Sequence, residues 1–276
     1  MLTSHSRPHW RQALIAIGLA IVSALACSNL PATAQPVTAA PKAVSVGPTA
    51  ETFDSGWVPV VAGMERRTLD AAFQSLGLAE HVVVFRIVPE QFTLRVRYTP
   101  GRPAFVSAWE PTARLVINAN FFDEANTAQG LLVSDGEYFG QSYADFGGML
   151  GVDPDGGVRI RSLADEPFQP DEPLSQAVQG FPMLIRPGAA PYANDDGARA
   201  RRTVVGQDGE GRLLVFVAPA GLFTLSELAA WLWGGDFGLV AALNLDGGGS
   251  TGYRAGANDG VDSLTPVPAV LAVYDR

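Results

Sequence analysis

The sequence of 276 residues has few of the side chains on which much enzyme chemistry depends. Cysteine and lysine each occur once, at Cys27 and Lys42, and of the three histidines only His81 lies beyond the first ten residues. These absences exclude a cysteine nucleophile, a Schiff-base or Walker lysine and a Cys/His zinc site from the rest of the chain. A Ser-His-Asp triad would require His81, but the valines that follow it indicate an ordinary strand residue. Any chemistry must therefore rest on Asp, Glu, Asn, Gln, Ser, Thr, Tyr and Arg.

Positive charge is also scarce. The chain has 28 acidic against 19 basic residues, and its formal net charge is −9. Removing residues 1–34, which contain Arg7 and Arg11 but no acid, would bring that charge to −11. An acidic protein of this kind is not expected to bind nucleic acid or anionic membrane surfaces.

The N-terminus has the pattern of a signal peptide. Ala13–Ala26 is an apolar run too short to span a bilayer comfortably. Ala32-Thr33-Ala34 then provides a small-x-small cleavage site, which predicts a signal peptide over 1–34 and an exported, periplasmic or extracellular protein without a membrane span. Cys27 leaves a lipoprotein as the alternative, although the residues before it fit a lipoprotein signal imperfectly. Cleavage after Ala34 would leave no cysteine, so that the mature protein needs no disulfide.

The remaining chain is predicted to form a flexible linker and one domain. Residues 35–55 are rich in Pro, Ala, Thr and Val, as is typical of a linker. Residues 56–276 are sufficient for a single large domain with a substantial core.

Periodicity predicts a β-rich α+β fold of mixed sheets with few helices. A helix is expected after Thr224, which begins the capping-box sequence Thr224-Leu225-Ser226-Glu227, and a weaker pattern suggests a short helix over 66–78. Residues 81–88 and 91–98 are expected to pair as a hairpin around Pro89-Glu90. Further strands or hairpins are expected at 114–120, 130–139, 149–160, 178–185, 199–208, 212–217 and 239–245.

Several of these strands end in polar residues. The apolar run 239–245 stops at Asp246, followed by three glycines, Ser250 and Thr251. Such an ending can present a carboxylate to a ligand that closely approaches the backbone, although Asp-Gly also forms simple turns. Asn118 and Asn120 end another strand, and an extended chain places both on the same face.

An arginine-rich strand offers a site for an anion. Alternation puts Arg199, Arg201 and Thr203 on one face and Arg202 on the other. The planar fork of arginine suits phosphate or carboxylate oxygens, although a solvated arginine is the commoner outcome at any single position.

Six motifs occur together in an order similar to that of the phosphodiester glycosidase family. They are NANFFD at 118–123, GLLVSDG at 130–136, QGFPML at 179–184, RRTVVGQD at 201–208, FTLSELA at 223–229 and NLDGGGS at 244–250. The resemblance covers residues 80–276. It implies hydrolysis of a sugar-1-phosphodiester, with the sugar released and a phosphomonoester left. We expect cell-wall, capsule or exopolysaccharide substrates and no cofactor or bound metal.

The resemblance also implies a set of site residues. The polar residues that correspond to the family motifs are Asn118, Asn120, Arg202, Thr203, Asp208, Asn244, Asp246 and Ser250. We expect Asp246, Arg202 and Asp208 to be catalytic, and the other five, together with Gly247, Gly248 and Gly249, to bind substrate. Many family members have glycine in place of one amide of the first motif, which makes Asn120 less secure than Asn118.

A sugar phosphate has a good leaving group, so one carboxylate could suffice as nucleophile or as the base that activates water. Asp246 is the candidate. Arg202 or Arg201 would offset the phosphodiester charge, the amides of 247–250 could cradle phosphate oxygens, and Asn118 and Asn244 would hold sugar hydroxyls. The second carboxylate is Asp208, Asp123 or absent, and these three alternatives stay open.

Two other classes of protein remain compatible with the sequence. A metal-dependent hydrolase could use Asp123, Asp208 and Asp246 as oxygen ligands for Ca²⁺ or Mg²⁺. A glycan-binding protein without activity could use exposed tryptophans as stacking surfaces. The candidates for that role are Trp57, Trp109, Trp231 and Trp233.

Overall fold

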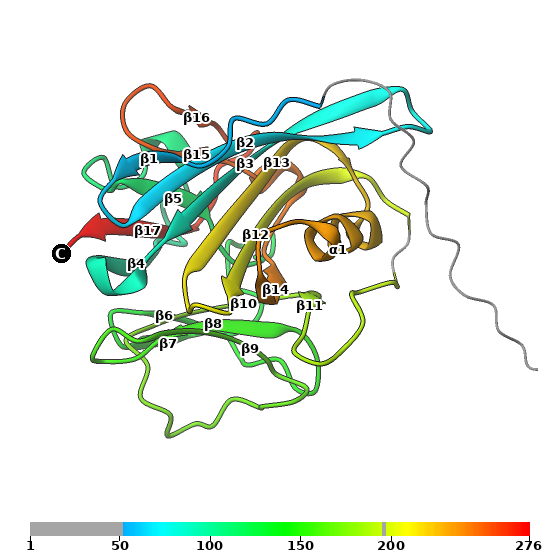
Figure 1. Ribbon diagram of the computed structural model, residues 1–276. Helices are drawn as coiled ribbons and strands as arrows, with labels where there is room; N and C mark the ends of the chain where they lie inside the picture. Colours follow the sequence, from blue (N-terminus) through cyan, green and yellow to red (C-terminus); the bar gives the residue numbers. More distant parts are fainter. Residues whose placement is uncertain (1–51, 195–196) are drawn as a thin grey trace, which may run out of the picture. The chain divides into compact units, whose positions relative to one another are not determined.

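The computed structural model describes residues 52–194 and 197–276 (Figure 1). The predicted signal peptide, its cleavage site, Cys27 and the linker up to residue 51 lie outside the described residues. Phe53 and Ser55, at the end of the predicted linker, exchange backbone hydrogen bonds with Asp70 and Thr68. The last residues of the predicted linker are therefore paired with β2. No helix in the described ranges is long and apolar enough to cross a membrane.

The largest sheet has seven strands in the order β1-β2-β3-β13-β12-β14-β11, and every neighbouring pair is antiparallel. Its strands are β1 (Val58–Val61), β2 (Met64–Phe73), β3 (Leu78–Ile87), β11 (Met183–Ile185), β12 (Ala200–Asp208), β13 (Leu213–Phe223) and β14 (Leu239–Asn244). The short helix suggested for 66–78 is wrong, because β2 pairs with β3 along ten residues. Pairing along a whole strand outweighs a weak local helical pattern.

Two five-stranded sheets complete the fold. One has the order β16-β15-β5-β17-β4 and the other β7-β6-β10-β8-β9. The first contains β4 (Phe92–Tyr98), β5 (Leu115–Asn118), β15 (Tyr253–Arg254), β16 (Gly260–Val261) and β17 (Ala269–Asp275). The second contains β6 (Leu132–Ser134), β7 (Glu137–Phe139), β8 (Gly148–Val152), β9 (Val158–Ser162) and β10 (Gln176–Gly180).

The expected hairpin of 81–88 with 91–98 is also wrong. A short 3-10 helix, Pro89–Gln91, separates β3 from β4, which pairs with β17 in another sheet. In contrast, the hairpins expected around Asp135-Gly136 and Asp155-Gly156 form as β6–β7 and β8–β9. Local turn chemistry is visible in sequence, whereas the choice of a distant partner strand is not.

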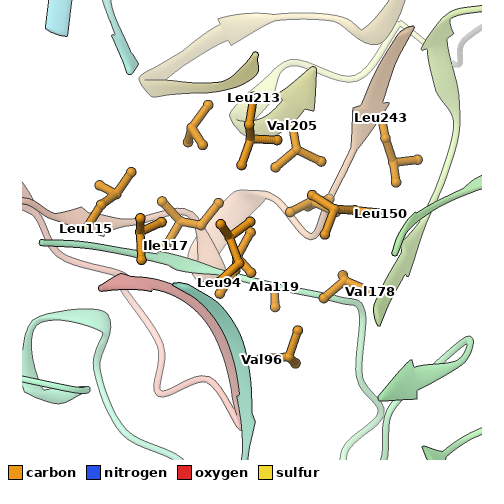
Figure 2. Packing of buried hydrophobic residues seen from close by; sticks show 14 of the residues in the cluster. Leu94, Val96, Leu115, Ile117, Ala119, Leu150, Val178, Val205, Leu213 and Leu243 are labelled. Carbon is orange, nitrogen blue, oxygen red and sulfur yellow. The ribbon is translucent and has the colours of Figure 1, made fainter. Parts of the chain in front are cut away.

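All three sheets contribute to one hydrophobic core (Figure 2). The seven-stranded sheet supplies Val205, Leu213 and Leu243 among others, and each five-stranded sheet supplies inward residues such as Ile117 on β5 and Leu150 on β8. These side chains are essentially inaccessible to solvent. Since the sheets share this core, the predicted β-rich α+β fold is confirmed.

Helix α1 (Leu225–Gly234) covers the other face of the seven-stranded sheet (Figure 1). It begins as predicted, with a capping box in which Thr224 Oγ1 accepts from the Glu227 amide and the Glu227 carboxylate accepts from the Thr224 amide. Leu228, Ala229 and Leu232 form its buried side. The helix therefore secures β12 and β14 from the face opposite the shared core.

Candidate functional site

The candidate site forms where β14 ends. β14 lies between β12 and β11, and hydrogen bonds to both neighbours continue to its last residues. The Leu245 amide donates to the Thr203 carbonyl at 2.9 Å, and the Asn244 amide donates to the Pro182 carbonyl at 3.1 Å. The strand thus delivers the next residue, Asp246, from a fixed backbone.

Asp246 is held from two sheets. Its amide donates to the Ala119 carbonyl at 3.1 Å, and its carbonyl accepts from Asn118 Nδ2 at 2.7 Å. One carboxylate oxygen accepts from the Gly247 amide at 2.9 Å, and the carboxylate also hydrogen bonds to the Ser250 hydroxyl. Burial raises the pKa of Asp246 to about 6, although these two hydrogen bonds oppose the shift. A carboxyl group with such a pKa is suited to proton transfer or nucleophilic attack near neutral pH.

Asn118 and Thr203 position this carboxylate. Thr203 Oγ1 donates to Asn118 Oδ1 at 2.7 Å, and the Gly252 amide donates to the same oxygen at 3.2 Å. Both side chains are fully buried and have hydrogen-bond partners. Their polar groups thus connect β5, β12 and the turn after β14, and the predicted substrate contact of these two side chains stays a prediction.

Other polar atoms at this strand end are buried without a partner among the described residues. They are Asn120 Nδ2, Asn244 Oδ1 and Thr251 Oγ1. The Asn244 side chain is fixed by its other end, because Nδ2 donates to the Phe181 carbonyl at 2.8 Å. An unsatisfied buried group costs about 1–3 kcal/mol, so unpaired donors and acceptors beside a perturbed carboxylate indicate a place where a polar ligand binds.

The glycines after Asp246 allow close backbone contacts. A Cβ at Gly247 would lie 2.8 Å from the Arg201 carbonyl, and Gly248 has a φ of +58°. The Gly249 carbonyl accepts from the amides of Leu264 and Thr265. Of the four amides expected to cradle phosphate, two have other partners, because Gly247 donates to Asp246 and Ser250 donates to the Gly247 carbonyl.

The two neighbouring arginines point to opposite faces of β12. Arg202 donates to the carbonyls of Ala198 and Phe223. Arg201 shares the face of Thr203. Its Nη2 donates to the Asp262 carbonyl at 2.9 Å, whereas its Nε and Nη1 are buried without a partner in the described ranges. Burial lowers the pKa of the Arg201 guanidinium, partly offset by the Asp262 and Glu80 carboxylates. Arg201 is therefore the better candidate for binding an anion.

Asp208 does not join Asp246. Asp208 pairs with Leu239 at the beginning of β14. The six residues of β14, a strand roughly 17 Å long, therefore separate Asp208 from the turn at Asp246. Its carboxylate is 3% exposed and accepts from the amides of Glu210 and Arg212 and from the Arg212 guanidinium. Asp208 thus closes the β12–β13 turn, and the structure does not favour a catalytic role for it.

The carboxylates required for the metal-dependent alternative are not assembled. Asp123 accepts hydrogen bonds from the amides of Ala125 and Thr127 within its own loop, and Asp208 lies at the far end of β12. Across residues 52–194 and 197–276, no group of three His, Cys, Asp or Glu side chains has the arrangement of a metal site.

The tryptophans do not form a shared surface. Trp109 is 8% exposed and donates to the Ala104 carbonyl, and Trp231 packs among the aromatic rings beneath α1. Trp57 lies against the guanidinium of Arg86, and Trp233 is 54% exposed on α1. The four tryptophans therefore do not provide one common stacking surface, and the glycan-binding alternative stays a prediction.

Tyr143 is a site residue that the sequence analysis missed. Its hydroxyl donates to the Gln129 carbonyl at 2.8 Å. Burial, and secondarily the charge of Asp246, raise the pKa of Tyr143 to about 12, which places the phenol within electrostatic reach of that carboxylate. The residue lies in the β7–β8 connection, where no periodicity distinguishes it.

Comparisons with known proteins identify the family and the fold of this chain. The family model described as phosphodiester glycosidase matches residues 111–274, more than half of the chain. A comparison with curated proteins gives no match. Among solved structures, the chain is similar to the catalytic domain of zebrafish N-acetylglucosamine-1-phosphodiester alpha-N-acetylglucosaminidase, auto-inhibited by its pro-peptide, with a TM-score of 0.63 and 22% identity over 82% of this chain and 88% of that one.

Two further structures share the fold. A hypothetical protein from Synechocystis has a TM-score of 0.57 and 16% identity, over 83% of this chain and 64% of that chain. A Burkholderia pseudomallei protein described as exported has a TM-score of 0.54 and 14% identity, over 71% and 74%. The chain belongs to the phosphodiester glycosidase family, which confirms the prediction from its six motifs.

Proposed function

We propose that this protein is an exported hydrolase that releases a sugar from a sugar-1-phosphodiester, with Asp246 as the reactive carboxylate. The observation that carries the proposal is the pKa of Asp246, raised to about 6 in a carboxyl group whose backbone is fixed from two sheets. Family membership supports a hydrolase that acts on phosphodiester-linked sugars. Cell-wall, capsule or exopolysaccharide fragments are the substrates to which an exported enzyme has access.

The reaction cleaves the bond between the anomeric carbon and the phosphate oxygen. In one version the ionised Asp246 takes a proton from water as the water oxygen bonds to the anomeric carbon, and the phosphomonoester leaves with the electron pair of the broken bond. In the other version Asp246 attacks the anomeric carbon and displaces the phosphomonoester, which leaves with the electron pair of the broken bond; water then hydrolyses the glycosyl ester, releasing the sugar and the carboxylate. Both versions require the carboxylate form of Asp246.

Isotope labelling tests this proposal directly. Purified protein is incubated in ¹⁸O water with sugar-1-phosphodiesters, beginning with that of N-acetylglucosamine, the sugar in the zebrafish relative's name. Mass spectrometry is expected to find sugar and an unlabelled phosphomonoester. Label in the phosphomonoester would show attack on phosphorus, and the absence of turnover across teichoic-acid-like and capsule fragments would leave a protein that only binds glycans.

Variants identify the carboxylate. Asp246→Asn should remain folded and lose turnover, whereas Asp165→Asn, at a side chain 63% exposed, should retain it. Wild-type turnover in folded Asp246→Asn would refute the assignment. Activity abolished by EDTA and restored by Ca²⁺ or Mg²⁺ would instead favour a metal-dependent hydrolase.

Arg201 is proposed to contact the phosphate, with Arg202 as its matched neighbour. A charge-assisted hydrogen bond contributes about 1.5–3 kcal/mol, so Arg201→Gln should raise KM roughly 10- to 100-fold. Arg202→Gln should alter stability more than KM, because its guanidinium bonds to the carbonyls of Ala198 and Phe223. The reverse ranking of the two KM values would return the role to Arg202.

A further inference from the structure

Four aromatic side chains contact one another beside the candidate site. Phe121 stacks on Phe181 with centroids 4.5 Å apart, and Tyr143 packs edge-on against Phe181 at 5.6 Å. Phe146 lies 4.7 Å from Tyr143 and 6.0 Å from Phe181. Phe146 is 49% exposed and Phe181 is 40% exposed. Phe121, Tyr143, Phe146 and Phe181, called here the aromatic cluster, thus leave large apolar rings in water.

The aromatic cluster is attached to the turn that carries Asp246. The Phe181 carbonyl accepts from Asn244 Nδ2, and Phe121 follows two residues after Ala119, whose carbonyl accepts from the Asp246 amide. The Tyr143 phenol is close enough for the charge of Asp246 to affect its ionisation. Three separate connections, after β5, between β7 and β8 and between β10 and β11, therefore bring these rings to one place.

The order of the strands shows which elements lie on either side of β14. β14 lies between β12 and β11 in the sheet. Arg201 comes from β12 on one side of Asp246, and Phe181 immediately precedes Pro182 and β11 on the other. The strand that carries Arg201 and the connection that carries Phe181 therefore lie on opposite sides of β14, the strand that ends at Asp246.

The chemistry of the cluster suits a sugar ring and not a phosphate. Exposed aromatic patches mark ligand sites, and the negative faces of aromatic rings attract C–H groups but not anions. A pyranose has an apolar C–H face and a rim of hydroxyls. At the same strand end, Asn120 Nδ2 offers a donor and Asn244 Oδ1 an acceptor for such hydroxyls, and both atoms are buried without a partner among the described residues.

We infer that the aromatic cluster is the platform for the sugar ring, with the pyranose on Phe146 and Phe181 and the phosphate directed across Asp246 toward Arg201. This inference rests on the proposed function and adds the orientation of the substrate to it. The cluster would then determine which sugars are accepted, and Arg201 would require only that the leaving group be anionic.

The test compares Phe146→Ala and Phe181→Leu with Trp233→Ala, which removes an equally exposed ring from α1. Steady-state kinetics on a sugar-1-phosphodiester that turns over should show KM raised about tenfold in both phenylalanine variants, and unchanged in Trp233→Ala. Inhibition by inorganic phosphate should be unchanged in the phenylalanine variants and weakened in Arg201→Gln. Unchanged KM in both phenylalanine variants, or a weakened phosphate effect in them, would overturn the inference while leaving the proposed hydrolysis intact.

A second measurement does not depend on turnover. Saturation-transfer NMR in the Asp246→Asn background can follow methyl glycosides of N-acetylglucosamine, glucose, galactose and mannose. Binding of at least one glycoside, lost in Phe146→Ala and retained in Trp233→Ala, supports the platform even if no phosphodiester is hydrolysed. If no glycoside binds, or if binding persists in both phenylalanine variants, the platform is refuted.

Discussion

Replacing Asp246 by asparagine should stabilise the protein at neutral pH while abolishing its activity. The folded state holds the pKa of this carboxyl at about 6, against a value of 3.8 for an exposed aspartate. Ionising Asp246 therefore costs more in the folded protein than in the unfolded chain. Asparagine has nearly the same shape, retains an oxygen that can accept from the Gly247 amide and carries no charge to desolvate.

The size of the effect follows from the pKa difference. A difference of about 2 units corresponds to about 3 kcal/mol, at 1.36 kcal/mol per unit. Because the folded-state pKa is raised, the contribution of Asp246 to stability is most favourable below about pH 4. It declines between pH 4 and 6, and the full penalty of about 3 kcal/mol applies from pH 7 upward.

Denaturant unfolding of wild type and Asp246→Asn at pH 4 and pH 7 measures this difference. The variant should gain about 2–3 kcal/mol relative to wild type on going from pH 4 to pH 7. In a thermal scan at pH 7 this corresponds to a rise of roughly 6–10 °C in Tm for a domain of this size. Taking the difference between the two proteins removes the contribution of every other titrating group.

Asp208→Asn is the matched control, because the Asp208 carboxylate, unlike that of Asp246, has a charged hydrogen-bond partner. The Asp208 carboxylate accepts hydrogen bonds from two backbone amides and from the Arg212 guanidinium. Its replacement should therefore destabilise the protein by about 1–3 kcal/mol at pH 7. The reasoning fails if Asp246→Asn is less stable than wild type at pH 7, or if its advantage is the same at both pH values.

Three further predictions concern activity and packing. Because Asp246 must be ionised, kcat/KM should fall as the pH drops below an apparent pKa near 6, to about a tenth of its plateau value at pH 5. If kcat/KM instead falls above pH 6, Asp246 acts as a general acid. Gly180→Ala should cost about 1–3 kcal/mol in chemical denaturation, since its Cβ would lie 2.4 Å from the Asn244 carbonyl, whereas Gly234→Ala, with no atom within 4 Å, should stabilise by up to about 1 kcal/mol. Thr224→Ala should lower stability by about 1 kcal/mol through loss of the α1 cap, and an unchanged unfolding free energy would show that the cap contributes nothing.

Features set by neighbours in the chain could be predicted from sequence. The capping box beginning at Thr224 defines the start of α1, and the Asp-Gly turns define two hairpins. The ending of an apolar strand at Asp246 was visible for the same reason, because both the strand and its glycine turn are local. None of this required knowledge of the partner strands.

Strand pairing was the part that local pattern could not supply. β3 pairs with β2 and β13 and not with the adjacent β4, because sheet partners are chosen by packing across the whole core. The same limit applies to the position of Asp208 relative to Asp246. Asp208 follows the arginines on β12, but antiparallel pairing places it beside Leu239, at the beginning of β14, whereas Asp246 follows the end of β14.

Alternation along β12 contained more information than the motif resemblance. It placed Arg201 with Thr203 and put Arg202 on the opposite face, as the structure shows. The resemblance nevertheless favoured Arg202. Phe146 and Tyr143 could not be found by either route, because they come from an irregular connection whose residues have no period.

The hydrogen bonds that fix Asp246 come from Asn118, Ala119 and Gly247, whereas Phe146 and Tyr143 come from a loop that supplies none of them. The proposed reactive carboxylate and two rings of the proposed sugar platform therefore come from separate segments of the chain. Exchange of the β7–β8 connection would therefore replace Tyr143 and Phe146 of the proposed platform while retaining Phe181 and the backbone hydrogen bonds that fix Asp246.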